Sequence, residues 1–462
     1  MRLALPALLL LAPACVSSDR SGEGDSGGGD GGFAGLHSAT WNGADGLVGA
    51  WEGEGAEVTL EVSGVDGTVV ATAASTSGSA TLTGLEEGEY VVRAWGTDGD
   101  DGGRALHQWV GSNRLVYRSE SAVAGGARTV HGEGGLVAVG GGTVDDGQVV
   151  LYDLSSGAEA TMLGKLSDLG EVSDVAVQGS LLAVATDTTL HPEAETGVRV
   201  YDLADPGTPL LRGSIPATQD NAHTLTFGES GILYLASTLN AWIAVYDVSE
   251  SGSPRSVSSL RLPQPSSVHD QTWANGQLWI AYTTGLAVAD TTDPANLELI
   301  GVLPASWPDA FVHNLWPTAD GLSLAMSEEA VSGSLRVVDI RDLNDMQIVA
   351  EVETAPEHSI HDVVVRDHYA FAAWYTDGLL VWDLSDPTAP VLVGQFDTWS
   401  GSEVVEQRSD GTEWPNVNGA AHVWPMGRHI AVADSQRGLV VFDFFPETIQ
   451  WGETWGGNEG VI

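Results

Sequence analysis

The phrase GLLVWDLSDPTAPVLVG, which ends at Gly394, recurs in degraded form six more times along this 462-residue chain. Each copy carries an aspartate directly after a run of alternating apolar residues, and successive aspartates are 49, 45, 43, 49, 44 and 60 residues apart. This period is expected of a repeat whose unit is a four-stranded sheet rather than a helix pair. The landmark aspartates, as we call them below, are Asp153, Asp202, Asp247, Asp290, Asp339, Asp383 and Asp443.

Within one unit the pattern indicates four short strands. In the unit that begins at His358, the runs IHDVVV, YAFAAWY, LLVWD and APVLVGQF are of strand length and rich in β-branched and aromatic residues. The segments between them, RDH, TDG and SDPTA, have the composition of turns. No sheet of this kind can bury both faces alone. We therefore predict an all-β chain in which seven sheets form a seven-bladed β-propeller over residues 122–462.

The repeat resembles the LVIVD family, in which a histidine-led strand is followed by G-L-x-V-x-D and then S-D-P-x-x-P. The sixth copy matches almost throughout, and GVRVYDLADPGTP and GLAVADTTDPANL match well. The third and fifth copies depart at the turn, and the first lacks the proline turn. The tail AAHVWPMGRHIAVADSQRGLVVFDF resembles the last repeat of choice-of-anchor B bacterial surface proteins. The resemblance covers residues 125–450 and implies a propeller, but it does not specify a ligand.

Residues 36–118 have a different pattern, with short alternating runs separated by Gly or Ser turns. This pattern predicts a small antiparallel β-sandwich. The piece ATLTGLEEGEYVVRAWGTD resembles the conserved corner of fibronectin type III domains, with Leu85, Gly88 and Tyr90 in the corresponding places. The resemblance implies structural roles for Leu85 and Tyr90, and a spacer or docking role for the domain.

The N-terminus has the pattern of an export signal. Residues 1–14 combine an arginine with a short apolar run that ends in small residues, which is typical of a signal peptide. Cys15, the only cysteine, follows directly and resembles the lipidated cysteine of bacterial lipoproteins, although an ordinary cleavage site is also present. Residues 15–33 are rich in Gly, Ser and Asp and predict a flexible tether. We expect an exported, lipid-anchored protein of the bacterial cell envelope, at the outer membrane or cell surface.

The chain is strongly acidic, with 63 Asp and Glu against 18 Lys and Arg, and a formal charge of −45. Such a surface repels phosphate backbones, so a nucleic-acid partner is not expected. Acidic glycine-rich loops near Asp98 and Asp145 raise calcium as a possible ligand, but neither has the full spacing of a calcium loop. A solvated acidic surface accounts for both loops equally simply.

Six histidines and one aspartate stand before the landmark aspartates. They are His131, Asp174, His223, His269, His313, His361 and His422. Because the leading strand of a propeller blade is the innermost one, we expect these side chains to form a ring in or at the central channel. Imidazole is a common ligand of transition metals, so metal binding is one interpretation. The other is that each histidine joins neighbouring blades by hydrogen bonds. His358, His361 and His422 are the strongest metal candidates on the first interpretation.

The landmark aspartates are interpreted as structural, because a carboxylate before a turn accepts backbone N–H bonds in an Asx turn. An enzyme is not favoured, since the chain has no G-x-S-x-G, HExxH or P-loop motif and no free cysteine nucleophile. No catalytic residue is therefore assigned.

The last repeat interval contains an insertion from Asp397 to Gly419. Long loops in compact domains are often functional, and aromatic side chains beside acids and amides are suited to sugars or peptides. A loop that is merely packed is the alternative. The ligand-binding candidates are Trp399, Glu403, Arg408, Trp414 and Asn416.

The sequence thus favours a monomeric, non-catalytic surface lipoprotein that recognises an extracellular protein or polysaccharide. The alternative is a metal-binding or metal-dependent hydrolytic propeller that uses the histidines. No cofactor beyond calcium or a transition metal is suggested.

Overall fold

The computed structural model describes residues 36–41, 47–51, 57–64, 68–85, 88–96, 106–110, 113–143, 145–186, 197–216, 222–238, 241–249, 253–263, 267–307, 310–401, 404–407 and 412–446. These residues form β-strands joined by turns, with one short 3-10 segment at Glu229–Gly231. The predicted all-β class is confirmed. None of the described residues belongs to a helix with the length and apolar character needed to cross a membrane.

The N-terminal part forms two small sheets that pack face to face. One sheet has the order β1-β2-β5 and the other β4-β3-β6-β7. Alternate residues of β2 and β3 point inward, so Leu47, Leu60 and Val62 are fully buried. Tyr90 of β6 is buried in this core, and Leu85 packs against it. The strands are β1 (Leu36–Trp41), β2 (Leu47–Trp51), β3 (Val58–Gly64), β4 (Val69–Ser75), β5 (Ser79–Leu82), β6 (Gly88–Trp95) and β7 (Leu106–Val110).

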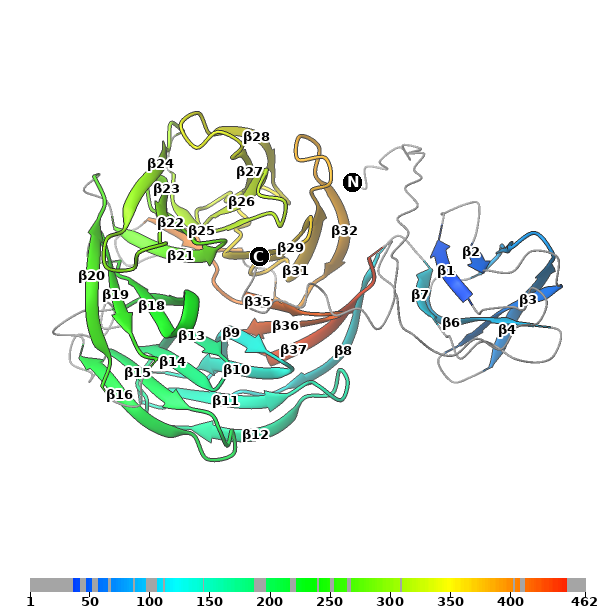
Figure 1. The fold of residues 1–462 in the computed structure, drawn as a ribbon, viewed down its shortest axis with the longest axis horizontal. Coiled ribbons are helices and arrows are strands. Elements are labelled where there is room, and N and C mark those ends of the chain that lie inside the picture. Colours follow the sequence, from blue (N-terminus) through cyan, green and yellow to red (C-terminus); the bar gives the residue numbers. More distant parts are fainter. Residues whose placement is uncertain are drawn as a thin grey trace.

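The larger part consists of seven four-stranded antiparallel sheets, counted over the described residues. Figure 1 shows them arranged around a common axis, with the first strand of each sheet nearest the centre. The first four sheets contain β9 (Ala127–Glu133), β10 (Leu136–Gly141), β11 (Gln148–Asp153) and β12 (Thr161–Leu166); β13 (Val172–Gln178), β14 (Leu181–Thr186), β15 (Gly197–Asp202) and β16 (Leu210–Pro216); β17 (Thr224–Phe227), β18 (Ile232–Ala236), β19 (Trp242–Asp247) and β20 (Arg255–Arg261); and β21 (Val268–Ala274), β22 (Gln277–Tyr282), β23 (Gly285–Asp290) and β24 (Glu298–Pro304).

The remaining sheets contain β25 (Val312–Pro317), β26 (Ser323–Glu328), β27 (Leu335–Asp339) and β28 (Gln347–Val352); β29 (Asp362–Arg366), β30 (Tyr369–Ala373), β31 (Leu379–Asp383) and β32 (Val391–Phe396); and β35 (Ala420–Met426), β36 (His429–Asp434), β37 (Gly438–Phe444) and β8 (Leu115–Ser121). Each innermost strand contacts the innermost strand of the next sheet, and β35 contacts β9, so the ring is closed. This is the arrangement of a β-propeller.

The last sheet draws its strands from both ends of the propeller. Its outer strand is β8, which pairs with β37 so that Ser119 lies opposite Val441. Residues 115–118, which the sequence pattern assigned to the sandwich, therefore belong to the propeller. The strand escaped the repeat pattern because it is separated from its own sheet by the six other sheets. The pairing ties the first strand of the ring to the last.

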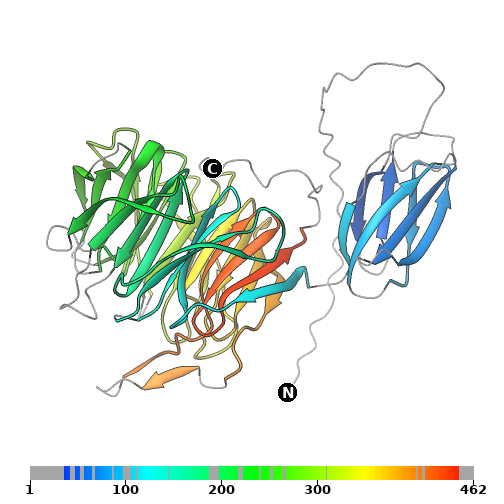
Figure 2. The same ribbon diagram turned by 90° about the horizontal axis from the view of Figure 1, so that it is seen from below.

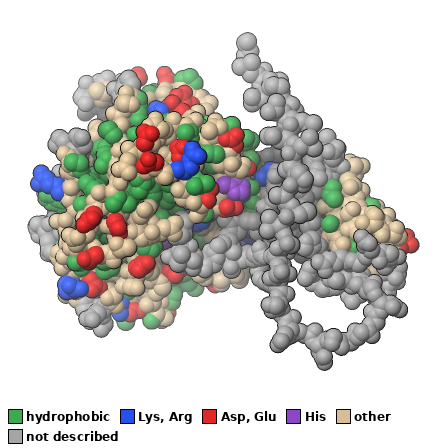
Figure 3. Space-filling model, turned by 45° about the horizontal axis from the view of Figure 1, so that its top comes forward, with side chains coloured by type: hydrophobic (Ala, Val, Ile, Leu, Met, Phe, Trp, Pro, Cys, Tyr) green, Lys and Arg blue, Asp and Glu red, His purple; other side chains and the backbone are tan. Residues whose placement is uncertain are grey.

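The sheets are held together by apolar layers between neighbouring faces. The second strands, such as β14 and β30, are buried along their whole length because both of their faces are covered by other sheets. One layer packs Phe371 of the sixth sheet with Phe442 and Phe444 of the last. The outer strands are largely exposed, as in β12. Acidic side chains are scattered over the face shown in Figure 3, in keeping with the strongly negative net charge.

Six of the seven landmark aspartates accept a hydrogen bond from the backbone N–H two residues later, which is the contact of an Asx turn. They are Asp153, Asp202, Asp247, Asp290, Asp339 and Asp383, with N to Oδ1 distances of 2.8 to 3.1 Å. Asp443 differs, because its buried carboxylate pairs with His429 and Arg118 instead. Here the strand continues past the aspartate to Phe444, so no turn begins there.

Candidate functional site: an axial cavity

The innermost strands enclose a cavity of about 870 Å³ on the axis of the ring. Its wall includes every residue of the predicted axial ring: His131, Asp174, His223, His269, His313, His361 and His422. The insertion after the sixth sheet also contributes Glu406, Trp414, Val417 and Asn418 to this wall. The two regions that depart from a simple blade pattern thus meet at one cavity.

A β-bulge in the innermost strands decides which side chains lie at one level. In β21 and β25 the register shift isolates one extra residue each, His269 and His313. His223 and His361 stand at the same position, just before β17 and β29, where their N–H groups donate to the carbonyl of the last residue of the neighbouring strand. We call these four residues the histidine row.

The imidazoles of the histidine row lie side by side. The ring centroids are 4.7 Å apart between His223 and His269, 4.0 Å between His269 and His313, and 4.0 Å between His313 and His361. The side chain of Tyr375 packs against His361 with a centroid distance of 4.9 Å. The row therefore forms a continuous arc along one side of the cavity.

Glu329 faces the middle of the histidine row. Its Oε2 atom lies 3.7 Å from Nε2 of His313, and its Oε1 atom accepts a 2.6 Å hydrogen bond from the Tyr375 hydroxyl. Tyr375 adopts a φ of 36°, a left-handed conformation that is strained for an aromatic residue. Glu329 and Tyr375 each directly follow the second strand of a sheet or the residue after it, a position that the sequence analysis did not consider.

The surroundings of the histidine row favour neutral imidazoles. Burial lowers the pKa of His313 well below its ordinary value, and the neighbouring imidazoles lower it further. Burial also lowers the pKa of His361 to about 3, although a hydrogen bond to the Ala421 carbonyl opposes the shift. Burial raises the pKa of Tyr375 well above its ordinary value, and the Glu329 carboxylate adds to this effect. The tyrosine therefore stays a hydrogen-bond donor at neutral pH.

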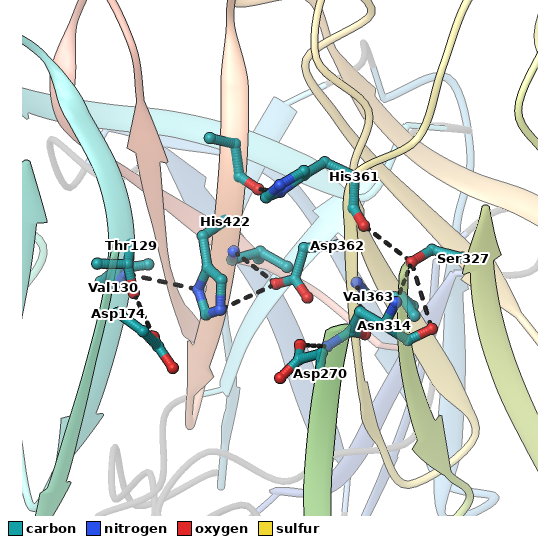
Figure 4. A network of polar contacts seen from close by, with 12 residues as sticks. Thr129, Val130, Asp174, Asp270, Asn314, Ser327, His361, Asp362, Val363 and His422 are labelled. Atoms are coloured by element: carbon teal, nitrogen blue, oxygen red, sulfur yellow. Dashed lines mark hydrogen bonds and ion pairs between the residues drawn. The ribbon is translucent and has the colours of Figure 1, made fainter. Parts of the chain in front are cut away.

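The residue that follows the bulge position in each sheet belongs to a second set, which we call the bridging ring. Its members are Thr129, Asp174, Thr224, Asp270, Asn314, Asp362 and His422. Figure 4 shows six of these residues together with the polar contacts around them. Unlike the histidine row, these side chains point across to the next sheet.

Seven contacts of the bridging ring run once around the axis, each from one sheet to the next. Thr129 donates to Asp174 (2.8 Å), Asp174 accepts from Leu225 N (2.8 Å), Thr224 donates to His269 O (2.9 Å), Asp270 accepts from Asn314 Nδ2 (2.8 Å), Asn314 accepts from Val363 N (3.2 Å), Asp362 accepts from Val423 N (3.5 Å), and His422 Nδ1 accepts from Val130 N (3.4 Å). The circuit stitches the innermost strands together where their backbones diverge.

The carboxylates of the bridging ring are buried and hard to ionise. Burial raises the pKa of Asp174 to about 6 and that of Asp270 to about 6. Burial raises the pKa of Asp362 to about 7, while N–H bonds from Val423 and Val363 act in the opposite direction. These shifts follow from the loss of water around a charge.

Two of the six predicted histidines are structural bridges rather than members of the histidine row. His422 accepts from Val130 N through Nδ1, which leaves Nε2 to donate to Asp362 at 3.3 Å. His131 accepts from Val177 N at 3.2 Å and stacks on Trp424 with a centroid distance of 3.8 Å. The predicted common height is therefore wrong for these two, because the loops that precede the landmark aspartates differ in length.

His358 does not line the cavity. Its Nδ1 atom lies 2.6 Å from Oδ1 of Asp377, and Asp377 also accepts a hydrogen bond from Thr354. The structure thus separates His358 from the other metal candidates and gives it a carboxylate partner of its own. Among the calcium candidates, Asp98 lies outside the described residues, and Asp145 is an exposed turn residue.

The insertion forms a small hairpin of β33 (Val405–Gln407) and β34 (Glu413–Pro415). In Figure 2 this orange hairpin projects from one face of the ring. Trp414 packs edge-on against Phe311 at 5.8 Å, and both line the cavity. Asn416 is buried beside the mouth, where it accepts two hydrogen bonds from Asn418. Trp399 does not line the cavity, and the candidates Glu403 and Arg408 lie outside the described residues.

One group of side chains is spaced for a metal ion among the residues that the structure describes. His269, His313 and Glu329 are buried, and each offers a ligand atom within 4.8 Å of the other two. Two of the three were predicted; Glu329 was not, because nothing at its position repeats from sheet to sheet. A signal was available, since a polar residue directly after a second strand faces the same mouth as the bulge.

Comparison with protein families supports the repeat identified in the sequence. Residues 359–398 match the family model of the LVIVD repeat. This stretch spans β29 to β32, which is the whole of the sixth sheet. No curated protein matches the chain. The repeat match and the recurring four-stranded sheets fit a β-propeller repeat protein.

Proposed function

We propose that this chain is an exported, surface-anchored binding protein without catalytic activity, whose seven-bladed propeller takes up an extracellular polysaccharide through the mouth of the axial cavity. The observation that carries the proposal is the insertion hairpin, which brings Trp414 and Phe311 together at the rim. Aromatic faces bind the apolar side of sugar rings, and the neighbouring Glu406 and Asn418 offer hydrogen bonds to hydroxyl groups. The cavity volume is within the range of small-ligand sites.

The remaining parts of the chain fit this role. The LVIVD repeat is found in extracellular repeat proteins, and the first 33 residues have the composition of a signal, a lipidation site at Cys15 and a tether. The sheets of three and four strands ahead of the propeller support a fibronectin type III-like spacer. The strong negative charge keeps nucleic acid and anionic headgroups away.

A glycan array with the purified mature protein tests the proposal. We expect binding to one class of polysaccharide, and we expect Trp414→Ala to weaken it by about tenfold, the loss typical of one aromatic contact. Trp399→Ala is the matched control, because Trp399 belongs to the same insertion but lies away from the cavity. No binding to any glycan, or equal losses in both variants, would contradict the proposal. Capture of a protein instead would favour the protein alternative.

The anchor is tested separately. Cells that express the full chain should incorporate labelled palmitate, and the Cys15→Ser variant should not. Label retained in the variant would place the lipid elsewhere, and no label in either would leave plain secretion.

A further inference from the structure

We propose that His269, His313 and Glu329 form a site for one divalent transition-metal ion of the zinc type. His361 is the nearest further ligand, since its ring lies 4.0 Å from that of His313. The site lies on the wall of the axial cavity and goes beyond the proposed function, because it shares no residue with the aromatic rim.

The distances suit such an ion. Zinc binds imidazole nitrogen and carboxylate oxygen at about 2.1 Å, so two ligand atoms on a tetrahedral ion are about 3.4 Å apart. Nε2 of His313 and Oε2 of Glu329 are 3.7 Å apart, and the third ligand atom is no more than 4.8 Å from either. A small closure of the side chains brings all three into range.

The residues behind the ligands already hold them in orientation. The Tyr375 hydroxyl donates to Oε1 of Glu329, which leaves Oε2 directed at the histidines. Nδ1 of His361 bonds to the Ala421 carbonyl and so must carry the proton, which leaves a lone pair on Nε2. Metal-binding imidazoles and carboxylates are characteristically fixed by such partners.

The histidine row is not needed to close the ring. The bridging ring already joins all seven sheets, and the two histidines that bridge do so by accepting backbone N–H groups. In contrast, Nδ1 of His313 is buried and has no hydrogen-bond partner among the described residues. A buried polar atom in that state is unfavourable. Several imidazoles that converge on one carboxylate are better explained by a shared cation than by packing.

The choice of metal follows from the ligand types. Calcium and magnesium prefer sets made only of oxygen ligands, whereas imidazole favours zinc, copper, iron and nickel. With two or three imidazoles and one carboxylate, the site resembles neither a calcium loop nor a thiolate site. The acidic surface of the protein adds a long-range attraction for any cation.

The test is a calorimetric titration of the chelator-treated full chain with zinc chloride, in an excess of magnesium that occupies exposed carboxylates. We expect one equivalent to bind, and we expect His313→Ala to lower the affinity by more than about 100-fold. His368→Ala is the control, because His368 pairs with Asp367 outside the cavity. Absence of zinc binding in the parent, or undiminished binding by His313→Ala, would overturn the proposal.

A second variant and a spectroscopic readout guard against a folding defect. Glu329→Gln keeps the shape of the side chain but removes its charge, and it should also lose zinc affinity while its circular dichroism stays that of the parent. Cobalt bound to the parent should give the visible absorption of a nitrogen and oxygen site, and this should vanish in both variants. Unchanged cobalt spectra would refute these ligands. Glycan binding by the metal-free parent is measured in parallel, so the two proposals fail separately.

Discussion

The bridging ring and the histidine row occupy adjacent positions in the same strands, yet they make different contacts. Asn314 of the bridging ring donates to Asp270 and accepts from Val363, so it joins three sheets. His313, one residue earlier, is extra in the strand register and turns its side chain to the other imidazoles and to Glu329. One position closes the fold, and the other gathers side chains that closure does not require.

The difference shows why a repeated residue in a propeller need not have one role. The bulge gives each sheet an additional residue whose side chain is free of the ladder pattern, and four sheets in succession place histidine there. The remaining three sheets have Arg128, Ser173 and Ala421 at this position. The row is therefore confined to one side of the axis, where a ligand can be held asymmetrically.

The most direct way to break the comparison is to truncate both neighbours in β25. Asn314→Ala leaves the Val363 N–H and the Asp270 carboxylate without a partner, and we expect it to lower the free energy of unfolding by about 4 kcal/mol. His313→Ala should lower it by about 1 kcal/mol in the metal-free protein, because it removes no bridge between sheets. Urea denaturation measures both, and zinc titration should show the reverse order of effects.

The exposed Asn344, which contacts only its own turn, serves as the control for loss of an asparagine. Asn344→Ala should change the free energy of unfolding by less than about 0.5 kcal/mol. If His313→Ala proved more destabilising than Asn314→Ala, the division between the two sets would be wrong.

Asp174 offers a sharper test of the bridging ring through pH. Its folded pKa is about 6, above the ordinary 3.8, so between these values the folded protein keeps a proton that the unfolded chain has released. Stability contributed by this group therefore falls as pH rises from about 4 to about 6. The charges that face it are His422, which lowers the pKa, and Asp270, which raises it.

Asp174→Asn removes that penalty and can reproduce the contacts of Asn314, with its oxygen toward Leu225 N and its amide toward Thr129. It loses one hydrogen bond, from Val175 N. We expect the variant to be more stable than the parent by about 2 kcal/mol at pH 7, and to lose this advantage by about pH 4. Urea denaturation across this range measures the difference, and a constant difference at all pH values would contradict the assignment.

The sequence predicted the sheets well and the levels of the axial residues poorly. Apolar runs such as YAFAA become fully buried second strands, so their pattern is visible in any copy. The level of an axial side chain depends on how many residues lie between it and the landmark aspartate. His269 lies 21 residues and His313 lies 26 residues before that aspartate, yet they share one level.

The converse also occurs, since His361 and His422 have nearly equal spacings but adjacent roles. His361 belongs to the histidine row, whereas His422 is a bridge to β9. Hairpin length absorbs the difference, and a bulge cannot be located from apolar periodicity alone. Glu329 was missed for a related reason: it follows a strand end in only one sheet, where repetition gives no signal.

Tyr375 should affect the histidine row without affecting the bridging ring. Tyr375→Phe removes the hydrogen bond to Glu329, and we expect zinc affinity to fall by about tenfold with one equivalent still bound. Tyr282→Phe is the matched control, because Tyr282 is a fully buried tyrosine of the same propeller that does not line the cavity. Full retention of affinity in Tyr375→Phe would remove this tyrosine from the support of the site.

The smallest effect is expected far from both sets, at a landmark aspartate. Asp383 accepts from Ser385 N at 2.8 Å in a turn that is open to water, so its replacement by alanine exposes an N–H that solvent can satisfy. We expect Asp383→Ala to lower the free energy of unfolding by about 1 kcal/mol, as measured by urea denaturation, with zinc and glycan binding unchanged. A loss as large as that of Asn314→Ala would mean that the outer turns, and not only the axial circuit, hold the sheets in register. Because this aspartate recurs in every copy and the bridging residues vary, the result would also show that recurrence in the repeat does not rank residues by their contribution to stability.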